Sequence, residues 1–270
     1  MSMSLLSILQ CLWAFLAYTF VTVAIPAIVF GKIFKKFSIV QRFMMYFTIG
    51  NFYVMNLVFV LELLHISNKF TLLLGTIIPA ILTYSKINKI SIRKKLLAAW
   101  KVFESIVNGH LGVKTAVFRF FSGLTKILKK AAKKLKQDVL LNWLDWLLLL
   151  GITLIYIRIY GSNLVTNFGY PYSDLPVHNY WINYLGQNQI FVAGIYPFGF
   201  HCIMYYIHEL FGLDVYVLLR VFFLAQTFYV NLMILTFLKQ CCKTKFTPYI
   251  GMFIYVATNI YATATYSRFV

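Results

Sequence analysis

The chain begins with a run of 26 residues, from Leu5 to Phe30, that contains no charged side chain. A helix of that length rises about 39 Å, which exceeds the roughly 30 Å of hydrocarbon in a bilayer. Hydrophobic residues make up 61% of the chain, and only 12% of its residues are charged. A soluble domain of 270 residues cannot bury so much apolar surface. The sequence therefore predicts an all-α, polytopic integral membrane protein.

Further apolar runs extend this prediction to about six transmembrane helices, which cover residues 5–30, 43–64, 70–84, 139–159, 215–238 and 248–266. The first run has no basic region before it and is followed by Lys32, so we predict a retained span rather than a cleaved signal peptide. The segment 190–211 is also apolar, but it carries two histidines, a glutamate and a proline. We predict an interfacial or re-entrant outer helix there.

The positive charges lie in three short segments between apolar runs. All but four of the 25 Lys and Arg residues are in these segments, and the exceptions are Lys69, Arg158, Arg220 and Arg268. Cytoplasmic loops of membrane proteins carry the excess of cations. The sequence therefore predicts an inner-membrane protein with its amino terminus and the loop 160–214 outside. Three regions follow from this topology: amino-terminal transmembrane helices at 1–85, a basic cytoplasmic segment at 86–138 and a second membrane module at 139–270.

Within the basic segment, residues 111–137 have the pattern of an amphipathic helix. Apolar residues recur there at intervals of three and four, and lysines occupy the opposite face. Such a helix rests in the headgroup layer of the inner leaflet, where each cation near an anionic lipid contributes about 1 kcal/mol. Nucleic-acid binding and calmodulin-like capture are the alternatives, but no base-stacking platform or recognition fold supports the first. Anionic membrane lipids are the predicted partner, and nucleic acid is not.

The predicted outer loop contains an aspartate and a histidine four residues apart. Gly, Asn and Pro residues before Asp174 predict a turn, and Pro176 suits the first turn of a helix. On this helix His178 lies one turn beyond Asp174 and faces the same way, while Trp181 anchors the helix at the interface. Asp174 can act as a general base or a metal ligand, with His178 as its hydrogen-bond partner or co-ligand. Alternatively, Asp174 only caps the helix and His178 is an interfacial polar residue.

Three arginines lie near span ends on the predicted outer side. Arg158 ends the fourth span, Arg220 lies inside the fifth, and Arg268 closes the sixth. Arginine can clamp a phosphate through two parallel hydrogen bonds, and a buried arginine marks a ligand path. Each of the three can instead extend to the lipid headgroups. Beside an acidic and aromatic loop, they point to an anionic lipid headgroup as a ligand.

The order of these features resembles a known superfamily of membrane enzymes. A span is followed by an aspartate, an outer helix, a Gly-x-Tyr-Pro-x-Gly-x-His segment, a second helix, a glycine and an arginine inside the next span, at positions Asp174, Gly194, Tyr196, Pro197, Gly199, His201, Gly212 and Arg220. This series looks like the amino-terminal module of the GT-C superfamily of integral-membrane glycosyltransferases, which includes protein mannosyltransferases and aminoarabinose transferases. The similar region covers about residues 139–270.

The resemblance implies a function and a set of site residues. In the superfamily, an aspartate of the first outer loop is the catalytic base or a metal ligand, and the donor is a polyprenyl-phosphate sugar. The expected function is therefore transfer of a sugar from a lipid-linked donor to an acceptor on the outer face, with Mg or Mn as the expected metal. The expected residues are Asp174 and His178 for catalysis, Asp174 for the metal, Arg158, Arg220 and Arg268 for the donor phosphate, and Trp181, Tyr196 and His201 for the acceptor or sugar.

Two features differ from the superfamily pattern. Its members often have Gly-Asp or Asp-Glu at the catalytic position, where this chain has Ser173-Asp174. They also continue for several more spans, so we expect either missing carboxyl-terminal helices or a membrane protein partner. The alternative functions are a non-enzymatic transporter or a scaffold subunit. Transporters bury paired ionisable groups near mid-bilayer or contain inverted repeats, whereas the acidic residues of this chain cluster at span ends.

Overall fold

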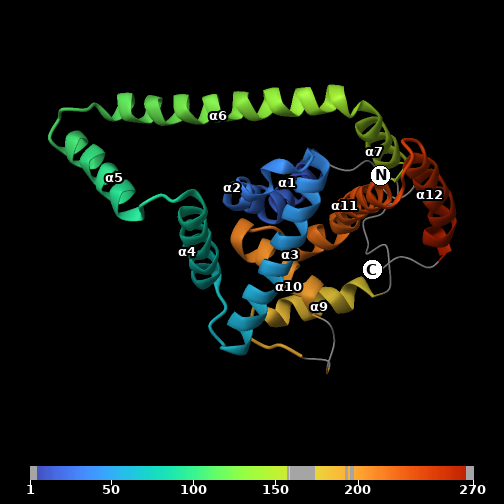
Figure 1. The fold of residues 1–270 in the computed structure, drawn as a ribbon. Coiled ribbons are helices and arrows are strands. Elements are labelled where there is room, and N and C mark those ends of the chain that lie inside the picture. Colours follow the sequence, from blue (N-terminus) through green and yellow to red (C-terminus); the bar gives the residue numbers. More distant parts are fainter. Residues whose placement is uncertain (1–4, 157, 159–173, 192–193, 195–197, 266–270) are drawn as a thin grey trace.

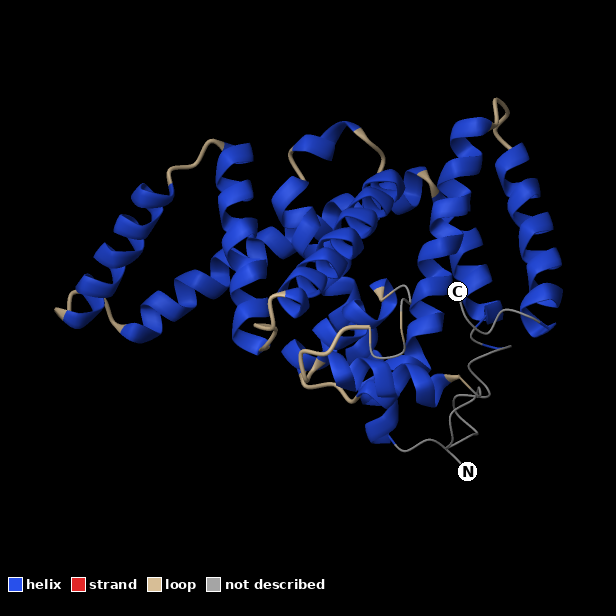
Figure 2. Ribbon diagram, turned by 90° about the horizontal axis from the view of Figure 1, so that it is seen from below, coloured by secondary structure: helices blue, strands red, loops and turns tan. Residues whose placement is uncertain are grey.

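The structure is a computed structural model that describes residues 5–156, 158, 174–191, 194 and 198–265. Every regular element in these ranges is a helix, which confirms the predicted all-α class. Figure 1 shows that most helices gather in one group, whereas α5 (Ile92–Val107) and α6 (Val113–Leu141) extend away from it. Figure 2 shows the same helices from below, joined by short loops.

The first apolar run forms three consecutive helical segments. They are α1 (Leu5–Thr19), the π-helical turn η1 (Phe20–Ala24) and α2 (Ile25–Phe30). Pro26 lies in the first turn of α2 and has no N–H to donate to the preceding turn. The wider turn of η1 directly before it lets the chain continue as a helix. A short 3-10 helix, η2 (Ile33–Lys36), follows at the lysines.

Polar caps define where the next two helices begin. Helix α3 (Ile39–Leu63) starts after Ser38, whose hydroxyl accepts a hydrogen bond from the Gln41 N–H. The Gln41 side chain in turn accepts one from the Ser38 N–H. Helix α4 (Lys69–Asn88) starts after Asn68 with the same reciprocal arrangement. These capping boxes satisfy backbone N–H groups that the start of a helix otherwise leaves unpaired.

Three helices of the described part are long and apolar enough to cross a membrane, namely Leu9–Phe30, Ile39–Leu63 and Lys69–Asn88. They agree with the first three predicted spans. A fourth is added if Lys129–Leu141 and Trp143–Ile155, which meet at 94°, form one broken span. The total of about six spans stays a prediction.

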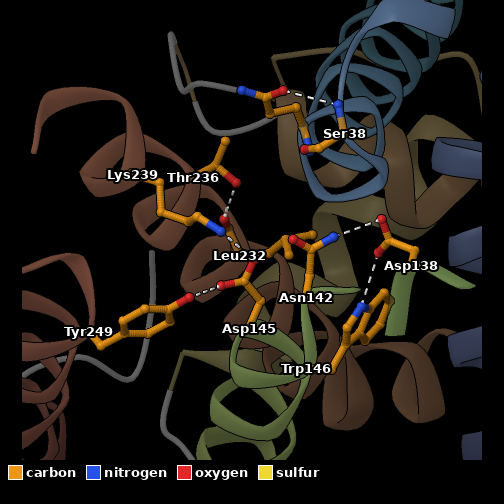
Figure 3. Close-up of polar contacts among 10 residues, drawn as sticks. Ser38, Asp138, Asn142, Asp145, Trp146, Leu232, Thr236, Lys239 and Tyr249 are labelled. Atoms are coloured by element: carbon orange, nitrogen blue, oxygen red, sulfur yellow. Dashed lines mark hydrogen bonds and ion pairs between the residues drawn. The ribbon is translucent and has the colours of Figure 1, made fainter. Parts of the chain in front are cut away.

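The basic segment contains two amphipathic helices. Helix α6 confirms the helix predicted at 111–137, and α5 is an additional one. After α6 the chain bends at Asn142 and continues as α7 (Trp143–Tyr156). Asp138 stabilises this bend, because its carboxylate accepts hydrogen bonds from Asn142 Nδ2 at 3.0 Å and Trp146 Nε1 at 3.1 Å (Figure 3). The apolar run predicted as a span at 139–159 is thus divided between two helices.

The carboxyl-terminal half contributes α9 (Leu175–Leu185), α10 (Gly199–Phe211), α11 (Val215–Cys241) and α12 (Thr247–Thr265). Seven consecutive residues of α10, from His201 to Ile207, are buried, and this helix packs against α3, α9, α11 and α4. An interfacial helix keeps one face open to headgroups or water. Helix α10 is more buried than that, and its interfacial or re-entrant placement in the membrane stays a prediction.

A partly buried ion pair joins α7, α11 and α12. Asp145 in the first turn of α7 is only 1% exposed, and Lys239 Nζ of α11 lies 2.5 Å from its carboxylate. The Tyr249 hydroxyl of α12 donates to the other carboxylate oxygen at 2.5 Å. Figure 3 shows the three side chains converging. One carboxylate oxygen of Asp145 accepts from the charged Lys239 and the other from the neutral Tyr249. The burial of Asp145 is therefore compensated, and the cluster fixes how these helices meet.

Candidate functional site

Helix α9 carries the first two residues of the predicted site. Pro176 lies in its first turn, as predicted, and Asp174 occupies the N-cap position. The Asp174 side chain is exposed and makes no capping hydrogen bond. The backbone N–H of His178 donates to the Asp174 carbonyl at 3.0 Å, which places the two residues one turn apart. The interpretation of Asp174 as a side-chain helix cap is therefore wrong, whereas its predicted spacing to His178 is confirmed.

His178 and His201 form a buried pair between α9 and α10. Nδ1 of His178 lies 2.9 Å from Nε2 of His201, which is hydrogen-bond distance. The two residues are 8% and 1% exposed. His201 is thus brought to the predicted site, but its ring cannot reach an acceptor at the surface. The expected acceptor contact of His201 is corrected: this residue contacts His178 instead.

Aromatic rings enclose the histidine pair. The rings of Trp181, Phe198 and Phe200 lie with their centroids 5.3, 5.1 and 5.4 Å from that of His201. Trp181 also packs edge-on against His178 at 5.5 Å. Trp181 is therefore a member of the site, as predicted, while its role as an interface anchor is limited because it is half-buried.

Burial sets the charge of the pair. It lowers the pKa of His201 to about 4, with a smaller contribution from His178. Burial also lowers the pKa of His178, although the nearby Asp174 opposes this effect. Both rings are therefore neutral at pH 7, and one donates its N–H to the bare nitrogen of the other. Asp174, His178 and His201 form a series that leads from an exposed carboxylate to a buried imidazole.

The remaining predicted residues are only partly described. Arg158 is exposed after the end of α7. Arg220 belongs to α11, but its side chain lies outside the described part, as do Tyr196 and Arg268 altogether. A meeting of the three arginines near Asp174 stays a prediction.

A metal at Asp174 also stays a prediction. Among the described residues, no group of three or more His, Cys, Asp or Glu side chains is close enough to hold a metal ion. Mg²⁺ prefers oxygen ligands, whereas the predicted co-ligand His178 supplies an imidazole nitrogen, which contacts His201. The described residues therefore do not make a magnesium site by themselves.

A further polar residue lies buried near this site and was not predicted as functional. Glu62, near the end of α3, is fully buried. Neither of its carboxylate oxygens makes a hydrogen bond of normal geometry to a described residue, although Ser67 and His65 lie close enough to interact with its charge. Burial and, to a smaller degree, Glu62 raise the pKa of the Cys202 thiol on α10 to about 12. Glu62 could have been singled out from the sequence, because it is the one acidic residue in the first three apolar runs.

Comparison with models of known protein families, with curated proteins and with solved structures found no match for this chain. The function is therefore inferred from the chemistry of the residues just described.

Proposed function

We propose that the protein is an integral-membrane glycosyltransferase that transfers a sugar from a polyprenyl-phosphate donor to an acceptor on the outer face. The observation that supports this function best is the series from exposed Asp174 through His178 to buried His201. A charged carboxylate at the surface is a suitable general base for a hydroxyl, and a neutral imidazole one turn away can orient it.

In this mechanism the Asp174 carboxylate takes the proton of the acceptor hydroxyl. The acceptor oxygen forms a bond to the anomeric carbon of the sugar while the bond from that carbon to the donor phosphate breaks. The polyprenyl phosphate leaves with the electron pair, so its charge changes from one negative to two, and the acceptor proton stays on Asp174. His178 orients the Asp174 carboxylate from one turn away, and His201 is a positioning residue because it acts through its 2.9 Å contact with His178.

The other roles follow the sequence prediction. Arg158, Arg220 and Arg268 bind the donor phosphate, and Trp181 and Tyr196 contact the sugar or the acceptor. This assignment requires an inner-membrane protein with the amino terminus and the loop 160–214 outside. The cation distribution supports that orientation, since the cytoplasmic side retains most lysines.

The test is transfer of a labelled sugar from a polyprenyl-phosphate donor by the full chain in proteoliposomes. Replacement of Asp174 by Asn is expected to lower the rate at least 100-fold, because one carboxylate is lost as general base. Asp214→Asn is the matched control. Asp214 is also an exposed helix N-cap, whose side chain accepts from Tyr216 N at 2.7 Å, and Asn caps equally well. Equal activity of both variants and the wild type would refute the assignment of Asp174.

The second candidate function is a non-enzymatic scaffold or transporter subunit. The observation that favours a scaffold is the exposed apolar face of α5 and α6, which includes Trp100 and Phe103 on α5 and Phe118 and Phe121 on α6. Such a face binds a membrane surface or a partner protein. Deletion of residues 111–137 separates the two functions, since a scaffold loses its localisation whereas an enzyme keeps its transfer activity per inserted molecule.

A further inference from the structure

An apolar cleft of about 120 Å³ lies between the first three membrane-crossing segments and α10. Its lining is mostly apolar and includes Phe30, Tyr53, Thr76, Ala80, Thr83 and Tyr206. A cavity of roughly 150 Å³ with apolar walls is known to accept a small apolar group. The cleft is somewhat smaller than that, so it accommodates a short segment of a hydrocarbon chain and not a whole one, and neither His178 nor His201 is among its lining residues.

Irregular helix geometry produces this cleft. At one level α3 approaches η1 so closely that a Cβ on Gly50 would lie 2.3 Å from the Thr22 carbonyl oxygen. Beside this contact, the π-turn of η1 and the prolines of α2 and α4, Pro26 and Pro79, interrupt the regular pattern of helix ridges. Side-chain ridges that lose their regular spacing cannot interdigitate, which leaves a void between the helices.

Three of the four hydroxyl-bearing residues in the wall have hydrogen-bond partners inside the protein. The Tyr53 hydroxyl donates to the Gly75 carbonyl. The hydroxyls of Thr76 and Tyr206 lie 2.6 Å apart and bond to each other. A sugar or another polar molecule would gain little from such walls, because its own hydrogen-bonding groups would lose water without replacement. The chemistry of the walls therefore selects a hydrocarbon chain.

One end of the cleft leads to a cluster of exposed cations. Lys32 follows the cleft residue Phe30 by two positions, and Lys86 lies one turn after the cleft residue Thr83 on α4. The ends of α2 and α4 meet here, since Lys32 Nζ donates to the Ile87 carbonyl at 3.4 Å. Lysines 35, 36 and 89 add three further exposed charges.

We propose that this cleft binds one anionic phospholipid, with an acyl chain between α2, α3 and α4 and the phosphate at Lys32 and Lys86. The combination of an apolar slot and a cationic end fits an anionic lipid and disfavours a zwitterionic one. Basic pockets between transmembrane helices on the cytoplasmic side bind such headgroups in general. The inference rests on the membrane placement proposed above, but not on glycosyl transfer.

The test uses the full chain purified in detergent and exposed to mixtures of phosphatidylglycerol and phosphatidylcholine. Native mass spectrometry then counts the lipids that each molecule retains. The wild type is expected to retain one phosphatidylglycerol and to prefer it at least tenfold over phosphatidylcholine. Ala80→Phe, which fills the slot, and the double variant Lys32→Gln/Lys86→Gln, which neutralises the mouth, should each lower that preference at least fivefold.

Two controls make the outcome decisive. Lys243→Gln/Lys245→Gln removes the same charge from the exposed segment between α11 and α12, away from the cleft, and should keep the preference. Soluble glycerol phosphate should not displace the lipid, because it has no chain. Retention that is unchanged by Ala80→Phe, or lowered equally by both lysine double variants, would overturn the proposal. Solubility of the chain without detergent would refute the membrane placement itself. Loss of sugar transfer alone would refute the proposed function but leave both the lipid site and the membrane placement intact.

Discussion

Acidification should destabilise this fold through the buried histidine pair. The pKa of His201 is about 4 in the folded protein, whereas the ordinary value of 6.5 applies to the unfolded chain. Below pH 6.5 the unfolded chain takes up a proton that the folded protein does not. The free energy of unfolding therefore falls as the pH decreases from about 6.5 to about 4, and it is unaffected by this group above pH 7.

The size of the effect follows from the two pKa values. Proton linkage gives a loss of about 1 kcal/mol at pH 5.5 and about 2–3 kcal/mol at pH 4.5, relative to pH 7.5. His178 adds to this loss, because burial lowers its pKa as well. A typical domain is stable by only about 5–15 kcal/mol, so a change of this size is readily measured.

The assay is unfolding of the detergent-solubilised protein at pH 7.5, 5.5 and 4.5, followed by tryptophan fluorescence. Carboxylates titrate in the same range, so the variant His201→Gln isolates the histidine contribution. Glutamine keeps a donor and an acceptor for His178 but takes up no proton. The loss of stability between pH 7.5 and 4.5 should be smaller in His201→Gln by about 2 kcal/mol or more. An equal pH dependence in both proteins would show that the pair is not buried as described.

Three further predictions, made with four substitutions, test other parts of the fold by the same unfolding measurement. Asp145→Ala should lower the free energy of unfolding by about 2 kcal/mol, because Lys239 and Tyr249 lose their hydrogen-bond acceptor. A loss well below 2 kcal/mol would mean that water takes the place of the carboxylate. Gly50→Ala should prevent folding, because the added Cβ meets the backbone of Thr22. The control Gly123→Ala has open space around the added Cβ and should stabilise α6 by about 0.5–1 kcal/mol. A Gly50→Ala protein that is more stable than Gly123→Ala would contradict the packing at η1. Glu62→Gln should raise the free energy of unfolding at pH 8 by about 1 kcal/mol, because the carboxylate that it removes is buried and has no hydrogen bond to a described residue. A lower free energy of unfolding in this variant would indicate a cation bound to Glu62.

Features encoded by local sequence could be predicted well. The first three spans agree with uninterrupted apolar length, and α6 agrees with its amphipathic period, because each depends on one segment and its solvent. The start of α9 was also predictable, since Pro176 fits only the first turn of a helix. The bend at Asn142 was not, because the apolar run continues across it and only the contacts of Asp138 reveal the break.

The site was predictable in its members but not in its arrangement. Asp174 and His178 are one helical turn apart, which spacing alone indicates. The contact between His178 and His201 joins residues 23 positions apart, and it depends on how α9 packs against α10. For the same reason the burial of α10 and of Glu62 was missed. Both depend on cover from other helices, which no local pattern contains.

The two ends of α3 have different surroundings, with a hydrogen-bonded corner at one end and lysines at the other. This difference predicts how α3 is oriented in a membrane. At the Leu63 end, Asn188 accepts a hydrogen bond from Ser67 N at 2.9 Å, and its carbonyl lies 3.0 Å from His65 Nδ1, so the α3–α4 corner is bound to the segment after α9. The other end of α3 lies among the lysines of η2, about 37 Å away for a helix of 25 residues. If α3 spans the bilayer, a membrane-impermeant reagent must reach a cysteine at position 188 and one at position 36 from opposite sides. If the reagent labels both positions from one side, α3 does not span the bilayer. The proposed catalytic loop and the cationic lipid site would then lie on the same side of the membrane.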